Sequence, residues 1–250
     1  MPAALVTGAG KRIGRALALS LADSGYEVGV HYNSSQSEAE AVVELIKSKG
    51  RNAISAKADL SNETNTAALI AETANALGPL SLLVNSASVF DFDDIETMTR
   101  ESWDRHIETN LRAPFKLAQD FAAQVSEGVD NLIVNIIDQR VLKLTPQFLS
   151  YTVSKAALHT LTVTLAQALG PKGIRVNAIG PGPTIKNPRQ SDEDWRRQNE
   201  ATILGRGAEP EDICSALRYL LSAKAVTGQM IAVDGGQHLA WETPDVLVKE

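Results

Sequence analysis

Short apolar runs alternate with longer segments of helical period along this whole sequence, and that alternation is the feature that most constrains its fold. The apolar runs cover residues 3–6, 28–32, 53–56, 80–84, 132–137, 174–179 and 230–233. Several of them carry no alternating polar positions, which is typical of strands covered on both faces in a parallel sheet. The intervening segments show helical spacing; Ile13, Ala16, Leu17, Ser20 and Leu21, for example, fall on one helix face.

The order strand, helix, strand, helix predicts an α/β protein. We expect a single Rossmann-type, doubly wound parallel sheet of seven strands, with helices on both faces and right-handed crossovers. Neither a repeat nor a low-complexity linker interrupts the pattern, so residues 1–250 are expected to form one domain. Residues 183–207 break the rhythm with Pro183, Pro188 and a charged stretch, and we expect a substrate loop there over the carboxyl edge of the sheet.

The composition of the chain excludes several classes of binding partner and indicates where the protein is located. The net charge is -6, with 24 basic against 30 acidic side chains and no basic block, which argues against a nucleic-acid ligand. Cys214 is the single cysteine, which excludes a disulfide framework or a thiolate metal cluster. His106, His159 and His238 lack ligand spacing, so no metal site is expected. No apolar run approaches the roughly 18 residues of a membrane helix and the first residues lack signal-peptide features, so we expect no membrane contact and a cytoplasmic location.

A glycine-rich turn joins the first apolar run to the first helical segment. It reads Gly8, Ala9, Gly10, Lys11, Arg12, Ile13, Gly14. Glycines let the backbone approach a phosphate closely, and the free N–H groups at the start of the following helix point at the anion. We therefore expect a dinucleotide to contact Gly8, Lys11, Arg12, Ile13 and Gly14. A tight turn without a ligand is the alternative interpretation.

The end of the second predicted strand bears on which cofactor binds. A carboxylate there would hold the adenosine ribose hydroxyls and repel a 2′-phosphate. The segment contains His31, Tyr32, Asn33, Ser34 and Ser35, with no carboxylate before Glu38. Neutral donors at these positions, together with the two cations of the glycine-rich turn, favour NADP(H) over NAD(H). The alternative for His31 and Tyr32 is that they are ordinary strand residues.

Tyr151 and Lys155 lie one turn apart on a predicted helix whose apolar positions continue to Leu169. Residues four apart share a helix face, so the lysine ammonium is expected near the phenol. A neighbouring cation stabilises a phenolate and would lower the tyrosine pKa toward neutrality, which makes the pair competent for proton transfer. Taken alone, a Tyr/Lys pair at this spacing is usually surface packing.

In combination, these motifs resemble the short-chain dehydrogenase/reductase family along the whole chain. The matching residues are Thr7, Gly8 and Gly14; Asp59 and Leu60; Asn85, Ser86, Ala87 and Ser88; Asn110; Tyr151 and Lys155; Pro181 and Gly182. The resemblance implies adenine contacts from Asp59 and Leu60, and places the segments 85–88 and 181–182 around the ribose and nicotinamide. It also implies that Lys155 holds the nicotinamide ribose and that Asn110 belongs to the catalytic set.

Two departures from the general family pattern resemble its pteridine reductase branch. Arg12 stands where a glycine is usual, and Asp138, thirteen residues before Tyr151, stands where a catalytic serine is usual. His31 with Tyr32, Ser88, and Phe90 match the same branch, in which an aromatic ring at the last position stacks on the pterin. Ser34 does not match, because that branch often carries an arginine there, and this weakens the assignment of NADP(H).

The resemblance predicts NADPH-dependent reduction of a C=N bond in a pterin or dihydrofolate-like ring. Tyr151 would donate the proton, Lys155 would tune it, and Asp138 would assist Tyr151 or relay a solvent proton. The substrate would contact Arg12, Ser88, Phe90, Asp138 and Tyr151, with Phe90 and the nicotinamide on its two faces. An ionised aspartate would repel a developing oxyanion, which disfavours reduction of a simple carbonyl.

Several alternatives stay open at this stage. The chain can instead be a general carbonyl or 3-oxoacyl thioester reductase, or a non-catalytic NADP(H)-binding regulator. Phe90 as a core aromatic and Asp138 as a structural turn cap are the corresponding alternatives for single residues. The family also implies a homotetramer packed through long helices at 102–126 and 151–169. We expect the tail after Asp234, with Gln237, His238 and Trp241, to close a neighbouring subunit's pocket.

Overall fold

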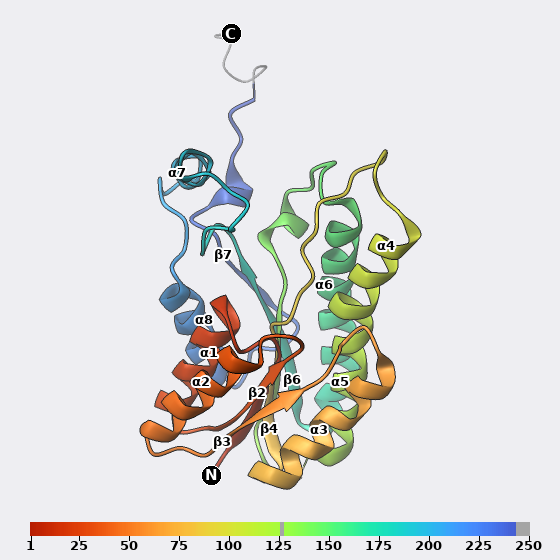
Figure 1. The fold of residues 1–250 in the computed structure, drawn as a ribbon, viewed down its shortest axis with the longest axis vertical. Helices are drawn as coiled ribbons and strands as arrows, with labels where there is room; N and C mark the ends of the chain where they lie inside the picture. Colours follow the sequence, from red (N-terminus) through yellow and green to blue (C-terminus); the bar gives the residue numbers. More distant parts are fainter. Residues whose placement is uncertain (126–127, 244–250) are drawn as a thin grey trace.

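The protein is built on one seven-stranded parallel sheet with strand order β3-β2-β1-β4-β5-β6-β7 (Figure 1). The structure is a computed structural model that describes residues 1–125 and 128–243. The strands are β1 (Ala3–Val6), β2 (Glu27–Tyr32), β3 (Ala53–Lys57), β4 (Leu80–Asn85), β5 (Asn131–Ile136), β6 (Ile174–Pro181) and β7 (Met230–Val233). The predicted Rossmann-type α/β fold is confirmed, and all seven apolar runs are strands.

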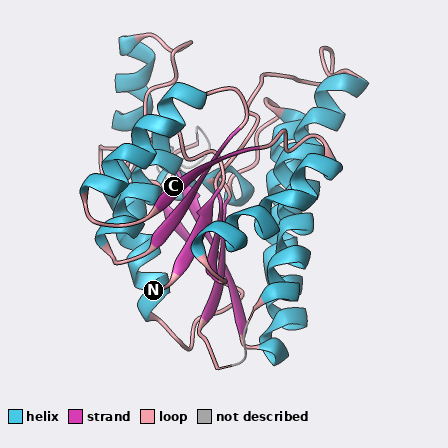
Figure 2. Ribbon diagram, turned by 60° about the horizontal axis from the view of Figure 1, so that its bottom comes forward, coloured by secondary structure: helices cyan, strands magenta, loops and turns pink. Residues whose placement is uncertain are grey.

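Helices cover both faces of this sheet (Figures 1 and 2). One layer contains α1 (Arg12–Asp23), α2 (Gln36–Ser48) and α8 (Pro210–Ser222). The other contains α3 (Glu63–Leu77), α4 (Arg100–Ile107), α5 (Ala113–Gln124) and α6 (Leu149–Leu169). Figure 1 shows α7 (Asp192–Glu200) apart from both layers, beyond one end of the sheet. No helix in the described parts of the chain is long and apolar enough to cross a membrane.

The core has two halves because the central strands send apolar side chains to both faces. On β1, Val6 packs into the cluster that contains Leu17 of α1, whereas Leu5 packs into the cluster that contains Phe121 of α5. Both leucines and Phe121 are fully buried. Burial on both faces explains why the strands read as continuous apolar runs.

The order of the strands reverses between β1 and β4, and the loops after these strands are joined there. The hydroxyl oxygen of Thr7 accepts hydrogen bonds from the N–H groups of Ser86 (2.9 Å) and Ala87 (3.0 Å). Gly8 follows with a φ of +64°, and a Cβ atom on it would lie 2.8 Å from the Cα of Ala87. Only glycine fits this close approach. Ligands of doubly wound sheets bind at such a reversal point.

The prediction of one continuous helix at 102–126 is wrong, because the segment is interrupted. α4 ends at Ile107, a π-helical turn covers Glu108–Arg112, and α5 begins at Ala113; Ser126 falls outside the described residues. Pro114 lacks an N–H group, so it cannot donate to the carbonyl of Asn110 as a regular α-helix requires. The wider turn is the local solution, and such turns are frequent at functional sites.

Candidate active site

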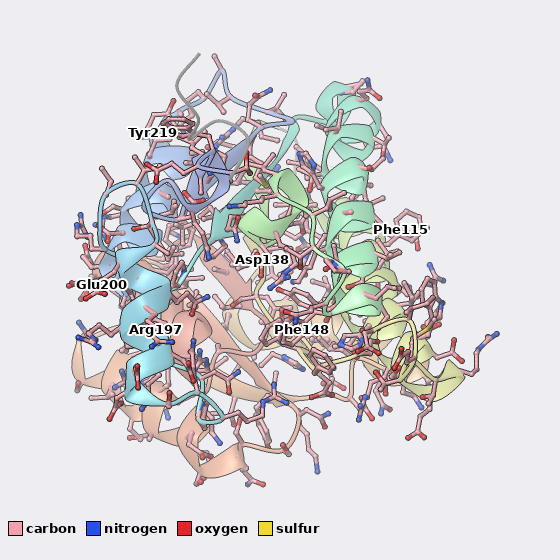
Figure 3. The ribbon with its side chains drawn as sticks, turned by 90° about the horizontal axis from the view of Figure 1, so that it is seen from above. Phe115, Asp138, Phe148, Arg197, Glu200 and Tyr219 are labelled. Atoms are coloured by element: carbon pink, nitrogen blue, oxygen red, sulfur yellow. The ribbon has the colours of Figure 1, made fainter. Side chains whose placement is uncertain are left out.

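A cleft of about 1040 Å³ lies beside the carboxyl ends of the strands. It is lined by the turns after β1, β4, β5 and β6 and by the first turns of α6, with α7 on its far side. Seen from above, Asp138 and Phe148 lie between α6 and α7 (Figure 3). The segment 183–207, predicted as a loop over this edge, lies there and contains α7.

Tyr151 and Asp138 form the central contact of this cleft. The Tyr151 hydroxyl donates a hydrogen bond to Oδ2 of Asp138 at 2.8 Å, and Oδ1 of Asp138 accepts the backbone N–H of Arg140 at 2.8 Å. Lys155 lies one turn further along α6, where its ammonium donates to the carbonyl of Ile136 at 2.9 Å. Its Nζ atom is 5.8 Å from the centre of the Tyr151 ring. The three side chains are therefore brought together, with the carboxylate as the direct partner of the phenol.

The protonation of these groups corrects one expectation. Burial, followed by the charge of Asp138 and its hydrogen bond, raises the pKa of Tyr151 well above its usual value. The predicted lowering by Lys155 is wrong for this structure, because the lysine bonds to a carbonyl and the phenol bonds to an acid. Burial also raises the pKa of Asp138 and lowers the pKa of Lys155 to about 8. The buried Tyr151 and Asp138 thus both hold protons more tightly than exposed groups do.

Asn110 does not line the cleft; it forms hydrogen bonds to the segment that does. Its side chain is fully buried in the π-helical turn. Its Oδ1 accepts the N–H of Val89 at 2.8 Å, and its Nδ2 donates to the carbonyl of Val89 (3.0 Å) and to the hydroxyl of Ser154 (3.1 Å). Asn110 therefore fixes the Ser88 segment against α6, which is a positioning role.

Two phenylalanines form the apolar end of the cleft. Phe90 stacks on Phe148 with a centroid separation of 4.4 Å and an interplanar angle of 7°, and it meets Tyr151 edge-on at 4.7 Å. Phe148 has a left-handed backbone with a φ of +56° just before α6 begins. Sequence reasoning identified Phe90 and missed Phe148, because no local pattern indicates a left-handed residue at this point.

The glycine-rich turn leads into α1 without a side-chain cap. Its N-cap residue, Lys11, makes no capping hydrogen bond, and the first turn of α1 contains no acidic residue. The free N–H groups at this end are donors for an anion. Gly14 is needed for the close packing of the turn, because a Cβ atom on it would lie 2.3 Å from the carbonyl oxygen of Gly8.

Both cations of this turn have protein partners. Nζ of Lys11 lies 2.7 Å from a carboxylate oxygen of Glu38, and this contact lowers the pKa of the carboxyl group. Arg12 has a left-handed φ of +52°, and its guanidinium donates to the carbonyls of Ile185 (2.7 Å) and Lys186 (3.1 Å). Arg12 thus connects the glycine-rich turn to the segment before α7.

The end of β2 is divided between core and cleft. His31 is buried, accepts the N–H of Gly8 at Nδ1 (3.0 Å) and donates from Nε2 to the carbonyl of Ala58 (3.1 Å). Burial lowers its pKa to about 4, so the ring is neutral and holds the turn in place. Tyr32 packs in the core and, unlike Asn33, does not line the cleft; Ser34 and Ser35 also lie outside its lining. Of the five predicted cofactor residues in this segment, His31 and Asn33 line the cleft, and Tyr32, Ser34 and Ser35 do not.

Most of the other predicted cofactor residues line the cleft. These are Ile13, Asp59, Leu60, Ser86, Ala87, Pro181 and Gly182, together with Ser88 from the substrate set. Asn85 does not line it; its side chain is buried and donates to Asn135 at 2.9 Å, which in turn donates to Thr162. Asn85 therefore connects β4, β5 and α6 beneath the site.

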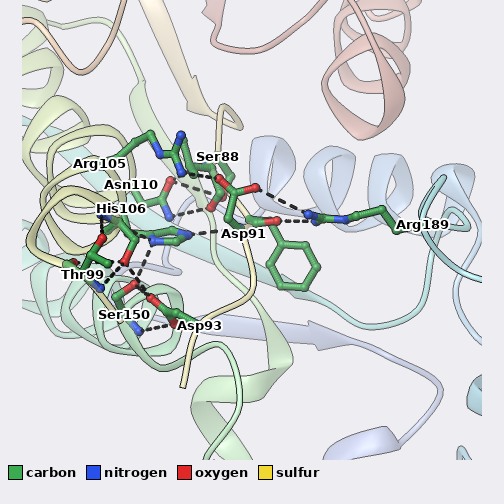
Figure 4. Close-up of polar contacts among 12 residues, drawn as sticks. Ser88, Asp91, Asp93, Thr99, Arg105, His106, Asn110, Ser150 and Arg189 are labelled. Atoms are coloured by element: carbon green, nitrogen blue, oxygen red, sulfur yellow. Dashed lines mark hydrogen bonds and ion pairs between the residues drawn. The ribbon is translucent and has the colours of Figure 1, made fainter. Parts of the chain in front are cut away.

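A buried polar network anchors the start of α6, and sequence reasoning missed it (Figure 4). Asp93 accepts the backbone N–H of Ser150 at 3.1 Å and also accepts its hydroxyl. Nδ1 of His106 lies 2.8 Å from that hydroxyl, and Nε2 of His106 accepts the N–H of Asp91 at 3.2 Å. Asp93 thus caps the helix that carries Tyr151. No spacing signal connects these three distant segments.

Residues 8–238 match the family model described as enoyl-(acyl carrier protein) reductase. The chain is 35% identical over 240 residues to the 3-oxoacyl-[acyl-carrier-protein] reductase FabG of Staphylococcus aureus (strain N315), covering 94% of this chain and 98% of that protein. It is also similar to two solved structures of FolM alternative dihydrofolate reductase 1 with NADP. The Brucella suis protein is 48% identical with a TM-score of 0.94, covering 98% of both chains. The Brucella canis protein is 46% identical with a TM-score of 0.93, covering 99% of this chain and 98% of that one.

Proposed function

Because this chain belongs to the short-chain dehydrogenase/reductase family, we propose that it is an NADPH-dependent enzyme that reduces a C=N bond of a pterin or dihydrofolate-like ring. The observation that carries this proposal is the hydrogen bond from Tyr151 to Asp138, at the position where the family usually has a serine. The stacked Phe90 beside that pair supports a flat substrate. The similarity to FolM alternative dihydrofolate reductases supports the same reaction.

The residues of the cleft fit NADP(H). The uncapped start of α1 offers backbone donors for the pyrophosphate, and the tight approach of Gly8 to Ala87 keeps side chains out of its way. Asn33 lines the cleft at the end of β2, where no acid stands to repel a 2′-phosphate. Both FolM structures contain NADP, which supports this choice. When bound, NADPH supplies the hydride.

The protein's own contribution is the proton. Reduction of a C=N bond leaves negative charge on nitrogen, and an acid must deliver a proton there. Tyr151 keeps its proton and can turn it from Asp138 to the substrate nitrogen; a protonated Asp138 then returns a proton to the phenolate and is itself reprotonated from solvent. The raised pKa of Asp138 suits it to supply that proton. The Lys155 ammonium donates to the carbonyl of Ile136, and its charge favours the carboxylate that Asp138 becomes once it has given up its proton.

The similarity to FabG favours a second candidate, reduction of a 3-oxoacyl thioester. Purified protein should be assayed with NADPH on 7,8-dihydropterin, 7,8-dihydrofolate and an acetoacetyl thioester. We expect turnover of a pterin or dihydrofolate with a higher kcat/KM than that of the thioester. Good thioester turnover with no activity on either heterocycle would remove the proposed function and establish the second candidate.

We also propose the organisation and location of the protein. The matched span of 8–238 supports a single cofactor-binding domain, with a substrate loop at 183–207. Val153 and Val163 are about 40% exposed on α6, which supports a homotetramer packed through this helix and α5. The absence of a membrane-spanning helix from the described residues, and the single cysteine, support a cytoplasmic location.

A further inference from the structure

Three arginines meet at the aromatic end of the cleft. Arg105 comes from α4, Arg140 from the turn after β5 and Arg189 from the segment before α7, and all three line the same cavity. Arg140 lies over the ring of Phe148 at 5.2 Å, and that ring stacks on Phe90. Nη2 of Arg189 donates to the carbonyl of Phe90 at 2.7 Å. We call these three residues the arginine rim.

The arginine rim has fewer negative partners than positive charges. A single carboxylate, Asp91, serves two of its members: it lies 2.9 Å from Arg105 and 3.6 Å from Arg189 (Figure 4). Arg140 forms no ion pair with any acidic side chain in the described part of the chain; its Nη1 donates to the hydroxyl of Thr145, and its buried Nε has no hydrogen-bond partner there. Nη2 of Arg140 and Nε of Arg189 form no hydrogen bond within the described residues, so these guanidinium donors remain available to a ligand.

The carboxylates that line the cleft do not neutralise this rim. Asp59 accepts the hydroxyl of Ser61, and Asp194 accepts the hydroxyl of Ser191. Asp138 is nearest to Arg140 in sequence, and burial raises its pKa, so it offers Arg140 less negative charge than an exposed aspartate. The aromatic end of the cleft therefore carries three guanidinium groups, and Asp91 is the one carboxylate among the described residues that forms ion pairs with any of them.

We propose that the arginine rim binds a carboxylate-bearing side chain on the substrate ring, so that the enzyme prefers folate-type substrates with an acyl-glutamate tail over pterins with a neutral tail. This inference rests on the proposed function, because it takes the flat ring to lie at the aromatic end of the cleft. Arginine is suited to this task since its planar fork binds a carboxylate with two parallel hydrogen bonds. Arg140 and Arg189 supply the free donors.

The test compares two substrates that differ in tail charge. We would measure kcat/KM for 7,8-dihydrofolate and for 7,8-dihydrobiopterin, whose side chain is a neutral diol, in the wild type and in an Arg140→Gln/Arg189→Gln double variant. We expect the ratio of the two values to fall about tenfold in the variant, which corresponds to about 1.4 kcal/mol. In the wild type, added salt should lower the same ratio, because screening weakens exposed charge pairs.

A matched control and a binding measurement keep the outcomes distinct. Arg100→Gln removes an exposed arginine of α4 that pairs with Asp104, and it should leave the ratio unchanged. Equilibrium binding of the oxidised forms, folate and biopterin, to protein loaded with NADP+, which carries no hydride to transfer, should show the same tail preference. Equal binding of both ligands, or an unchanged ratio in the double variant, would overturn the inference even if both substrates react. Tail-dependent binding by a protein that reduces neither 7,8-dihydrofolate nor 7,8-dihydrobiopterin would instead refute the proposed function and leave the anion site standing.

Discussion

At the scale of single residues, the chemistry of the cleft depends on how burial changes three ionisable groups. Tyr151, Asp138 and Lys155 are withdrawn from water together, so the charged form of each is less favourable than it is in an exposed group. The spacing of Tyr151 and Lys155 on one helix is visible in the sequence, and the family resemblance added Asp138. The predicted lowering of the Tyr151 pKa is wrong, since the direction of that shift depends on desolvation and on which atom Lys155 contacts.

Lys155 should leave a signature in the pH dependence of stability. Its pKa is lowered to about 8 in the folded protein, so between pH 8 and about 10 the unfolded chain binds more protons at this site than the folded one. Stability contributed by this site therefore rises with pH across that window, by at most about 1.4 kcal/mol per pH unit. Urea unfolding at several pH values should show that, as the pH rises, the free energy of unfolding of the wild type increases relative to that of Lys155→Met. A constant difference from pH 8 to pH 10 would contradict the lowered pKa.

At the scale of elements, the start of α6 is positioned by the loop after β4. Asp93 caps the helix through Ser150, and His106 completes the buried contact. The strands that support this arrangement were predictable, because burial on both faces leaves a continuous apolar run. The Asp93 cap and the π-helical turn at Asn110 were not predictable, because each joins segments that no local period relates.

Removal of the Asp93 carboxylate should weaken both the helix start and catalysis. In Asp93→Ala, the N–H and hydroxyl of Ser150 lose their acceptor in a buried place, which we expect to lower the free energy of unfolding by about 1–3 kcal/mol. The value of kcat should fall by a larger factor than KM for NADPH rises, because Tyr151 is the residue next to Ser150 on α6 and would lose its position. Glu96→Ala, an exposed change in the same loop, is the control for denaturation and kinetics. An Asp93→Ala protein with wild-type stability would show that the network does not anchor the helix.

At the scale of the whole molecule, the parallel sheet brings distant loops to one edge. The topology was predictable from the alternation of elements, and its reversal between β1 and β4 places the cofactor turn beside the Ser88 segment. The contacts that hold the segment 183–207 over the cleft were not predictable. Two hydrogen bonds hold this segment, from Arg12 to the carbonyl of Ile185 and from Arg189 to the carbonyl of Phe90. Every residue has a backbone carbonyl, so the sequence does not indicate which ones these arginines contact.

Assembly is the prediction that belongs to this scale. Each chain has a mass of 26.8 kDa, and light scattering should give about four times that value if the family's tetramer forms. Val163→Glu places a charge on the exposed face of α6 and should produce smaller species. Val129→Glu changes an equally apolar and similarly exposed valine outside this helix, and should leave the mass unchanged. A wild-type monomer would contradict the proposed assembly.

The proton-supplying pair is the central claim, and it is tested most directly by the rate of NADPH oxidation on 7,8-dihydropterin or 7,8-dihydrofolate in Asp138→Ser. This change leaves Tyr151 with a neutral partner at the position where the family usually has one. We predict a loss of roughly 100-fold or more in kcat, within the range ascribed to general acid catalysis, with the affinity for NADPH retained. A variant that reduces the heterocycle as fast as the wild type would contradict the account.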